Sequence, residues 1–298
     1  MTDARTIAAA LGLRRSGAIF GGACPACGYG GAFTVRDVDG RTLFRCFAGC
    51  GQADVVDALR RAGAWGGDAS NDRAPFPARP VARGGPEARG GQSDASEVAL
   101  RIWRASRPLV GTVGESYLRR ARGLAGIEMP AELRFAPALK HPTGNTWPAM
   151  VAAVRNLSGK VVAIHRTFLR PDGDGKAPAS PAKMSLGPIG GGAVRLAPAG
   201  PHLVIGEGLE STMSAMLGSG LPGWCGLSAG GVRRMILPAD VVMVTVAADR
   251  DTVGVQAAED AARRWHAEGR TVRVALPPAP HDDWNDALLA AEASHVSA

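Results

Sequence analysis

The segments LVIGEG at residues 203–208 and VVMVTVAADRD at residues 241–251 decide the fold of this chain. Each begins with an apolar run that is long enough for a buried strand and too short to span a membrane. The first run ends at Glu207, and the second ends at Asp249 and Asp251. Because ligands bind outside the carboxyl ends of parallel strands, we expect these three carboxylates to lie in one crevice.

Acidic residues at such strand ends are typical of a magnesium site. Clustered carboxylates repel one another unless a cation lies among them. Hard oxygen ligands in twos and threes, with room for phosphate oxygens, are those that Mg²⁺ uses in phosphate chemistry. Two more acids, Asp283 and Asp286, follow in the segment DDWND. They either bind a second ion or orient the first ligands, unless Asn285 and Asp286 simply cap the last helix.

Strand-like and helix-like segments alternate throughout residues 201–298. The order is HLVIG, LESTMSAMLGSG, GWCGLS, VVMVTVAA, VGVQAAEDAARRWHAEG, TVRVALP and WNDALLAAEA. Alternation of this kind predicts an α/β domain in which helices flank a parallel sheet.

Four of the five cysteines lie close together near the N-terminus, with the spacing Cys-x2-Cys-x18-Cys-x3-Cys. In a reducing cytosol such clustering favours a metal over disulfides. Four thiolates can close a tetrahedron around structural zinc, and a predicted hairpin (AFTVRD and RTLFRC) lies between the two pairs. The alternative is a set of ordinary buried cysteines, which is our interpretation of Cys225. The zinc ligands are expected to be Cys24, Cys27, Cys46 and Cys50.

Composition divides the chain into four parts. Residues 1–65 hold an opening helix at about 3–14 and the cysteine module, which we interpret as a zinc ribbon. Residues 66–96 are rich in Gly, Pro, Ala, Arg and Ser and are predicted to be a disordered linker. An α+β unit follows at 97–198, with two helices (EVALRIWRAS and ESYLRRARG) and a hairpin (AMVAAVR and KVVAIHRTFLR). The α/β domain occupies residues 199–298.

Charge favours a polyanionic partner. The 298 residues have a formal net charge of +7, which fits nucleic acid. On the middle hairpin, Arg166 alternates onto an apolar face, which is costly unless that face opens on a polyanion. With Lys176 and Lys183 nearby it indicates a phosphate-binding cleft; a snorkelling side chain is the alternative. The sequence shows no secretory signal or membrane span, so we expect a cytoplasmic protein with no membrane partner.

These motifs resemble a known combination. Residues 201–290, with GEG, AADRD and DDWND, resemble a Toprim domain, the catalytic fold of bacterial-type primases, topoisomerases and some nucleases. The segments CPACG and FRCFAGCGQADVVDAL resemble the zinc-binding domain of bacterial-type primases. The middle segments WPAMVAAVRNLSGKVVAIHRTFLR and KMSLGP resemble the part of the primase core that precedes Toprim. The order of the parts is similar to that in primases of phage and mobile-element type.

The resemblance implies an enzyme that makes short RNA primers on single-stranded DNA from nucleoside triphosphates, with a replicative helicase as a further partner. It implies that Glu207, Asp249 and Asp251 hold catalytic Mg²⁺, and that Lys183 and Arg166 contact phosphates. Three positions depart from the family pattern: Cys27 replaces a histidine, Arg166 is offset by one residue, and Ser211 replaces an acid. Glu210, one place before Ser211, is expected to favour the helix N-terminus as a first-turn residue.

Two other functions suit the same residues. One is a Toprim-type nuclease or phosphodiesterase that uses the same metal site, and the other is a non-catalytic DNA-binding module for a replication complex. A topoisomerase would need a tyrosine nucleophile, and the chain offers only Tyr29 in the cysteine module and Tyr117 on a basic helix. Neither tyrosine is well placed for that role.

Overall fold

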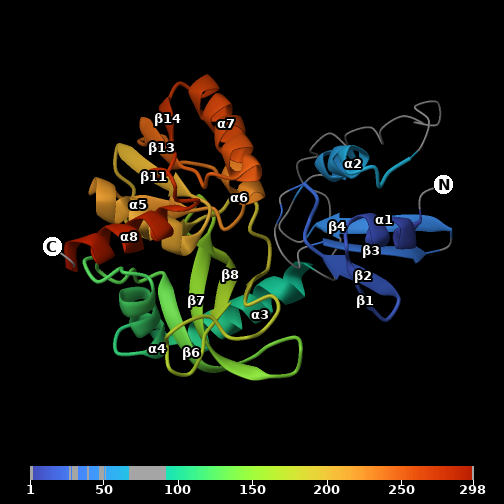
Figure 1. Cartoon of the computed structure of the whole chain (residues 1–298), viewed down its shortest axis with the longest axis horizontal. Helices are drawn as coiled ribbons and strands as arrows, with labels where there is room; N and C mark the ends of the chain where they lie inside the picture. The colour runs from blue at the N-terminus through green and yellow to red at the C-terminus, as the bar shows by residue number, and fades with distance from the viewer. Residues whose placement is uncertain are drawn as a thin grey trace.

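A computed structural model describes residues 3–26, 28, 33–38, 40–46, 50, 52–66 and 92–296. An N-terminal module lies beside a larger body made of a middle unit and a C-terminal domain (Figure 1). Of the disordered linker expected at 66–96, residues 67–91 lie outside the described residues, whereas residues 92–96 already belong to a helix (Gln92–Ala105), so the linker ends earlier than expected. In the described part, no helix is long and apolar enough to cross a membrane.

The N-terminal module is built on an antiparallel sheet in the order β1-β2-β3-β4. The expected hairpin is confirmed, because β3 and β4 pair from Phe33 with Cys46 to Val38 with Arg41. The expected opening helix is shorter than 3–14: it ends at Ala10, since the following chain turns at Gly12 and joins the sheet. The elements are α1 (Ala4–Ala10), β1 (Arg14–Ser16), β2 (Ile19–Gly22), β3 (Phe33–Val38), β4 (Arg41–Cys46) and α2 (Gln52–Arg61).

The middle unit is an antiparallel sheet in the order β5-β6-β7-β8-β9, with α3 packed on one face. The predicted hairpin is confirmed as β7 and β8. The helix expected at ESYLRRARG is split into a short α-helical turn and a π-helical turn. The elements are α3 (Gln92–Ala105), β5 (Arg107–Pro108), α4 (Val113–Ser116), η1 (Tyr117–Ala121), β6 (Leu133–Lys140), β7 (Thr146–Arg155), β8 (Val161–Phe168) and β9 (Lys183–Leu186).

The C-terminal domain has the predicted parallel sheet flanked by helices. Its order is β10-β12-β11-β13-β14, in which only β10 runs antiparallel. The alternation read from the sequence is confirmed, apart from the additional helix α6. The elements are β10 (Val194–Arg195), β11 (His202–Gly206), α5 (Leu209–Ser219), β12 (Gly223–Cys225), α6 (Ala229–Arg234), β13 (Met243–Ala247), α7 (Thr252–Ala267), β14 (Thr271–Ala275) and α8 (Trp284–Val296).

The middle unit and the C-terminal domain share one apolar core. Tyr117 and Met150 from the first belong to the same buried cluster as Leu209 and Met213 from the second. The backbone also links them, because β10 pairs with β12 while the preceding residue, Ala193, bridges to β7. Side chains that face each other between the two parts are therefore held at fixed separations.

Candidate active site between the middle unit and the C-terminal domain

Glu207 is placed by the tight turn from β11 to α5. A Cβ on Gly206 would collide with Thr212, so the strand can meet the helix this closely only with glycine at that position. Gly208 is the N-cap of α5, which leaves Glu207 at the carboxyl end of a central strand.

Asp249 and Asp251 both follow β13, the strand beside β11, but they have different surroundings. Asp249 faces the space next to Glu207 and lines the pocket together with Ser211. Asp251 is exposed, and its Oδ1 accepts a hydrogen bond of 2.6 Å from the backbone of Gly254, so it caps α7. Arg250 between them binds backbone carbonyls of the loop that precedes α8.

Asp283 and Asp286 also differ in position, because only Asp283 lines the pocket. Asp283 lines the same space as Asp249 and caps α8, because its Oδ1 accepts from the backbone N–H groups of Asn285 at 2.8 Å and Asp286 at 2.9 Å. The cap is therefore Asp283, and not Asn285 or Asp286 as the alternative interpretation had it. Asp286 is exposed on the first turn of α8 and does not line the pocket.

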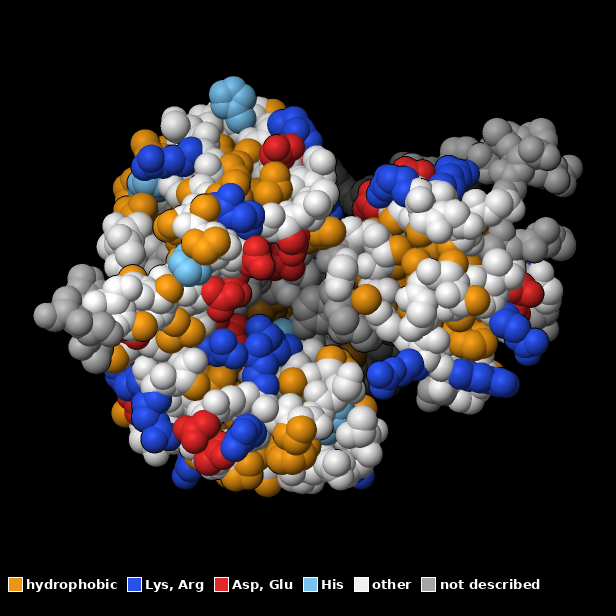
Figure 2. Space-filling model, in the orientation of Figure 1, with side chains coloured by type: hydrophobic (Ala, Val, Ile, Leu, Met, Phe, Trp, Pro, Cys, Tyr) orange, Lys and Arg blue, Asp and Glu red, His pale blue; other side chains and the backbone are white. Residues whose placement is uncertain are grey.

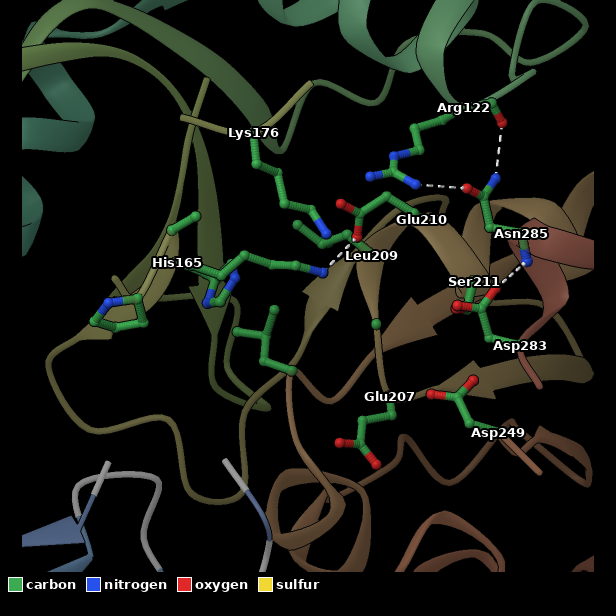
Figure 3. Close-up of a pocket in the computed structure, with 15 residues that line it drawn as sticks. Arg122, His165, Lys176, Glu207, Leu209, Glu210, Ser211, Asp249, Asp283 and Asn285 are labelled. Atoms are coloured by element: carbon green, nitrogen blue, oxygen red, sulfur yellow. Dashed lines mark hydrogen bonds and ion pairs between the residues drawn. The ribbon is translucent and has the colours of Figure 1, made fainter. Parts of the chain in front are cut away.

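A pocket of about 420 Å³ lies between the C-terminal domain and the middle unit. Acidic and basic side chains face each other across this hollow (Figure 2). Figure 3 shows Glu207, Asp249 and Asp283 on loops of the C-terminal domain and Glu210 on its helix α5, with Lys176 and Arg122 of the middle unit facing them. The charged lining residues are Glu207, Glu210, Asp249 and Asp283 with Arg122, Lys176 and Lys183.

The carboxylates at the strand ends are hard to ionise together. Burial, with Asp249 and then Asp251 nearby, raises the pKa of Glu207 to about 7. Burial, with Asp283 and Asp251 nearby, raises the pKa of Asp249 to about 6. The buried Oδ1 of Asp249 has no hydrogen-bond partner among the described residues. A buried acceptor without a donor beside mutually repelling acids fits a divalent cation.

The geometry also shows what such an ion would require. In the described part of the chain, no three carboxylates bring ligand atoms within 4.8 Å of one another. A single ion held by Glu207, Asp249 and Asp251 therefore needs side-chain rotation, and Asp251 would have to leave its cap.

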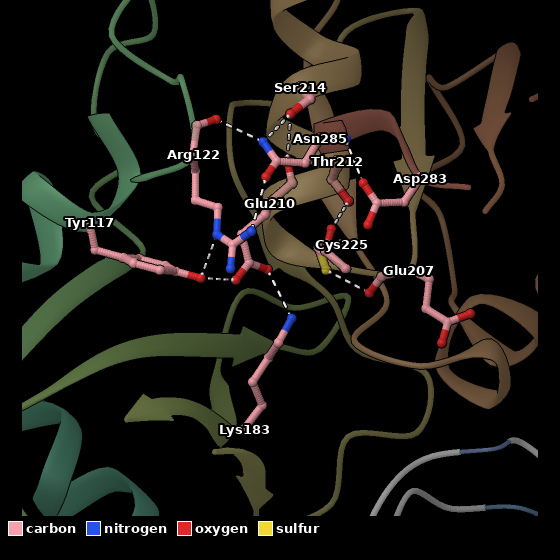
Figure 4. A network of polar contacts seen from close by, with 11 residues as sticks. Tyr117, Arg122, Lys183, Glu207, Glu210, Thr212, Ser214, Cys225, Asp283 and Asn285 are labelled. Atoms are coloured by element: carbon pink, nitrogen blue, oxygen red, sulfur yellow. Dashed lines mark hydrogen bonds and ion pairs between the residues drawn. The ribbon is translucent and has the colours of Figure 1, made fainter. Parts of the chain in front are cut away.

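The basic wall of the pocket consists of Arg122, Lys176 and Lys183 of the middle unit. Glu210 connects this wall to the C-terminal domain (Figure 4). This carboxylate pairs with Lys183 Nζ at 3.1 Å and accepts a hydrogen bond of 2.7 Å from the Tyr117 hydroxyl. Glu210 is only 5% exposed. Glu210 does lie in the first turn of α5, as expected, but its side chain also reaches into the interface with the middle unit. Burial would raise its pKa, but Lys183 and Lys176 outweigh burial and hold the pKa below the usual range.

The structure places two of the three predicted phosphate-binding residues in the pocket. Lys176 and Lys183 line the pocket, whereas Arg166 is buried away from it and donates to the backbone carbonyl of Ser185 at 3.3 Å. His165, to which the sequence analysis assigned no role, also lines the pocket. Burial and then Lys183 lower the pKa of His165 to about 3, so its imidazole is neutral.

The cysteine module brings three of its predicted ligands together. The sulfur atoms of Cys24, Cys46 and Cys50 lie within 4.8 Å of one another, and those of Cys24 and Cys50 are 3.9 Å apart. Thiolates bound to zinc at about 2.3 Å on a tetrahedron lie roughly 3.8 Å apart, so the arrangement fits that metal. Cys27 lies outside the described residues.

Magnesium affinity should rise with pH. Glu207 and Asp249 have pKa values raised to about 7 and about 6, and a protonated carboxyl group cannot ligate the ion. Between pH 6 and pH 8 we expect affinity to increase about tenfold, since most of the Glu207 titration falls in that interval. Calorimetric titration with MgCl₂ at pH 6, 7 and 8 measures this. Equal affinity at all three values would show that these groups do not bind the ion.

Two family models match the chain. Residues 202–293 match the Toprim domain, and residues 93–196 match a domain of unknown function (DUF7146). Together they cover the C-terminal domain and the middle unit that line the pocket. No match is found among the curated proteins.

Solved structures of primases are similar to this chain at low identity. The zinc-binding and RNA polymerase domains of the Aquifex aeolicus primase share 13% identity, with 98% of this chain and 81% of that chain covered and a TM-score of 0.46. The primase fragment of the bacteriophage T7 primase-helicase protein shares 17%, with coverage of 93% and 97% and a TM-score of 0.40. A DNA primase domain from Pseudomonas aeruginosa shares 13%, with coverage of 68% and 78% and a TM-score of 0.42.

Proposed function

Residues 202–293 are a Toprim domain, and from that premise we propose that the chain is a primase-like nucleotidyltransferase that joins ribonucleotides into short RNA primers on single-stranded DNA. One observation carries the proposal: a single pocket has Toprim carboxylates on one side and cations of the middle unit on the other. A nucleoside triphosphate with its metal ion needs both walls, because the ion requires hard anionic ligands and the phosphates require positive charge.

The reaction transfers a nucleotidyl group. The 3′-hydroxyl of the growing strand attacks the α-phosphate of the incoming nucleotide, and pyrophosphate leaves. Bound Mg²⁺ would make the hydroxyl a better nucleophile and stabilise the charge on the phosphate oxygens. In this chain Glu207 and Asp249 would hold it, with Asp283 and Asp251 completing or orienting the ligand set. Lys176 and Lys183 would bind the triphosphate from the opposite wall.

One assay tests the proposal against its two rivals. Purified protein is incubated with single-stranded DNA, labelled ribonucleotides and MgCl₂, and the products are resolved by length. Short new RNA supports the primase. Cleavage of the DNA without synthesis would instead identify a Toprim-type nuclease. If the protein shows neither activity, the remaining candidate is the non-catalytic DNA-binding module. The template is unwound DNA, so the partner of a primase of this kind would be a replicative helicase.

Replacing Lys176 by Ala should raise the KM for nucleoside triphosphates about tenfold, because one cation of the phosphate wall is lost. Burial lowers the pKa of Lys176 to about 8. The wild-type lysine is therefore charged below that pH and loses its charge as the pH rises through about 8. Nucleotide affinity should fall over the same interval in the wild type, and this limb should be absent from the variant.

Lys160→Ala is the matched control, since Lys160 is exposed in the turn between β7 and β8. Steady-state rates at varied nucleotide concentration from pH 6.5 to 9.5 give both quantities. An unchanged KM in Lys176→Ala would remove Lys176 from the nucleotide site.

A further inference from the structure

We propose that Glu210 is a positioning residue, which acts on the nucleotide through Lys183 and not through a metal ion. The inference rests on the proposed function of the pocket. It assigns a task to a buried carboxylate that lies between the acidic and the basic wall.

The contacts of Glu210 cross the boundary between the two parts of the body. Glu210 lies on α5 of the Toprim domain, whereas Lys183 begins β9 and Tyr117 begins η1 of the middle unit. Arg122 Nε donates to the Tyr117 hydroxyl at 2.9 Å, so the hydroxyl accepts from one side and donates to Glu210 on the other. Glu210 therefore fixes a lysine of one part from a helix of the other (Figure 4).

Both oxygens of this carboxylate are already engaged. Oε1 accepts from Tyr117, and Oε2 pairs with Lys183. Asp249, by contrast, keeps a buried oxygen without a hydrogen-bond partner in the described part of the chain. The acid with both oxygens engaged is not the one that needs an ion.

Asn285, near Glu210, also forms hydrogen bonds between the middle unit and the C-terminal domain. Its Nδ2 donates to the backbone carbonyl of Arg122 at 2.7 Å and to Ser214 Oγ at 3.1 Å. Asn285 follows Asp283, which lines the pocket, by two residues. The hydrogen bond from Asn285 to Arg122 therefore links the loop that carries Asp283 to the segment of the middle unit that carries Arg122. With this support, loss of Glu210 should displace Lys183 without separating the two parts of the body.

The consequence is a division of work between the two lysines. Lys183 is held in one orientation by an ion pair, which suits a group that must meet a phosphate at a fixed place. Lys176 has no ion pair within 4.0 Å among the described residues and supplies positive charge without that constraint. Removing Glu210 should therefore matter only while Lys183 is present to be positioned.

A double-mutant cycle measures this dependence. The variants are Glu210→Gln, Lys183→Met and the two combined, assayed for primer synthesis at varied nucleotide and MgCl₂ concentrations. In the wild-type background Glu210→Gln should lower kcat/KM for nucleotide about tenfold, as expected for the loss of a charge-assisted contact. In the Lys183→Met background the same change should cost less than about twofold. The MgCl₂ concentration for half-maximal activity should stay the same.

Equal losses in both backgrounds, or a shift in the magnesium requirement, would overturn the proposal. Glu132→Gln is the matched control, because Glu132 is in a partly buried ion pair with Arg155 at 2.9 Å, away from the pocket, and its loss should leave kcat/KM unchanged. If Glu210→Gln does not fold, as judged by circular dichroism, Tyr117→Phe takes its place in the cycle, since it removes the hydrogen bond and leaves the charges.

The cycle can also be measured without primer synthesis. The readout is then the affinity for a fluorescent ATP analogue in the presence of MgCl₂. A change in affinity from Glu210→Gln that disappears in the Lys183→Met background supports the positioning role, even if the wild type makes no primers. An affinity change that persists there would overturn it. Failure of the proposed function and failure of this inference are thus separate results.

Discussion

Glu207→Gln should lower the rate of primer synthesis by about 10²–10³-fold. The substitution keeps the size of the side chain and its place at the carboxyl end of β11, but it removes one of the two half-buried acids at the strand ends that would hold Mg²⁺. The loss should appear in kcat at saturating nucleotide, since the lysines of the opposite wall are untouched. Extension of labelled primers under single-turnover conditions measures it.

The same variant should be more stable than the wild type when no metal is present. The pKa of Glu207 is raised from an ordinary 4.5 to about 7 in the folded protein. A carboxyl group of this kind contributes stability below its unfolded pKa, and that contribution is lost as the pH rises through about 7. Glutamine avoids this loss. At pH 8 with EDTA, Glu207→Gln should gain about 1–3 kcal/mol in the free energy of unfolding.

MgCl₂ should reverse the order, because the ion stabilises only the protein that binds it. Glu259→Gln, an exposed change on α7, is the control and should alter neither activity nor stability. An active Glu207→Gln variant, or one less stable than the wild type in EDTA, would remove Glu207 from the metal site.

The positions of Glu207 and Asp249 could be predicted because they follow from local pattern. Each comes directly after an apolar run that has the length of a buried strand, and adjacent parallel strands end at the same edge of a sheet. The β3–β4 and β7–β8 hairpins were predictable for a similar reason, since a turn signal separates two strand-like runs.

The orientation of Asp251 and Glu210 depends on structure that the sequence does not display. Alternation along an extended segment would have placed Asp251 beside Asp249, but β13 ends at Ala247 and Asp251 starts a helix as its cap. Glu210 is a first-turn residue of α5, as the sequence predicted, but the contacts of its side chain were not predicted. Its partner Tyr117 lies 93 positions away in the chain, and no local signal connects the two.

Arg166 shows that the energetic cost of a charged side chain on an apolar face does not identify its binding partner. An arginine on an apolar strand face does need compensation. Here it comes from the backbone carbonyl of Ser185 and from the ring of Phe168, whose centroid lies 5.9 Å from the guanidinium carbon. The sequence identified the need for a partner but not which partner meets it.

Cys46→Ser should release zinc and unfold the N-terminal module while the rest of the chain stays folded. The module's buried core is small, with Ile7, Phe33, Val35 and Leu59 as its main side chains, so bound zinc supplies on the order of 10 kcal/mol of its folding free energy. Metal analysis should find less than about a tenth of the zinc of the wild type, and limited proteolysis should cut first before residue 92. Cys225→Ala is the control, because Cys225 lies in β12 apart from the cluster and its loss should leave zinc bound. Full zinc content in Cys46→Ser would mean that the clustered sulfur atoms are buried thiols, since a tetrahedral site cannot lose a thiolate and keep its affinity.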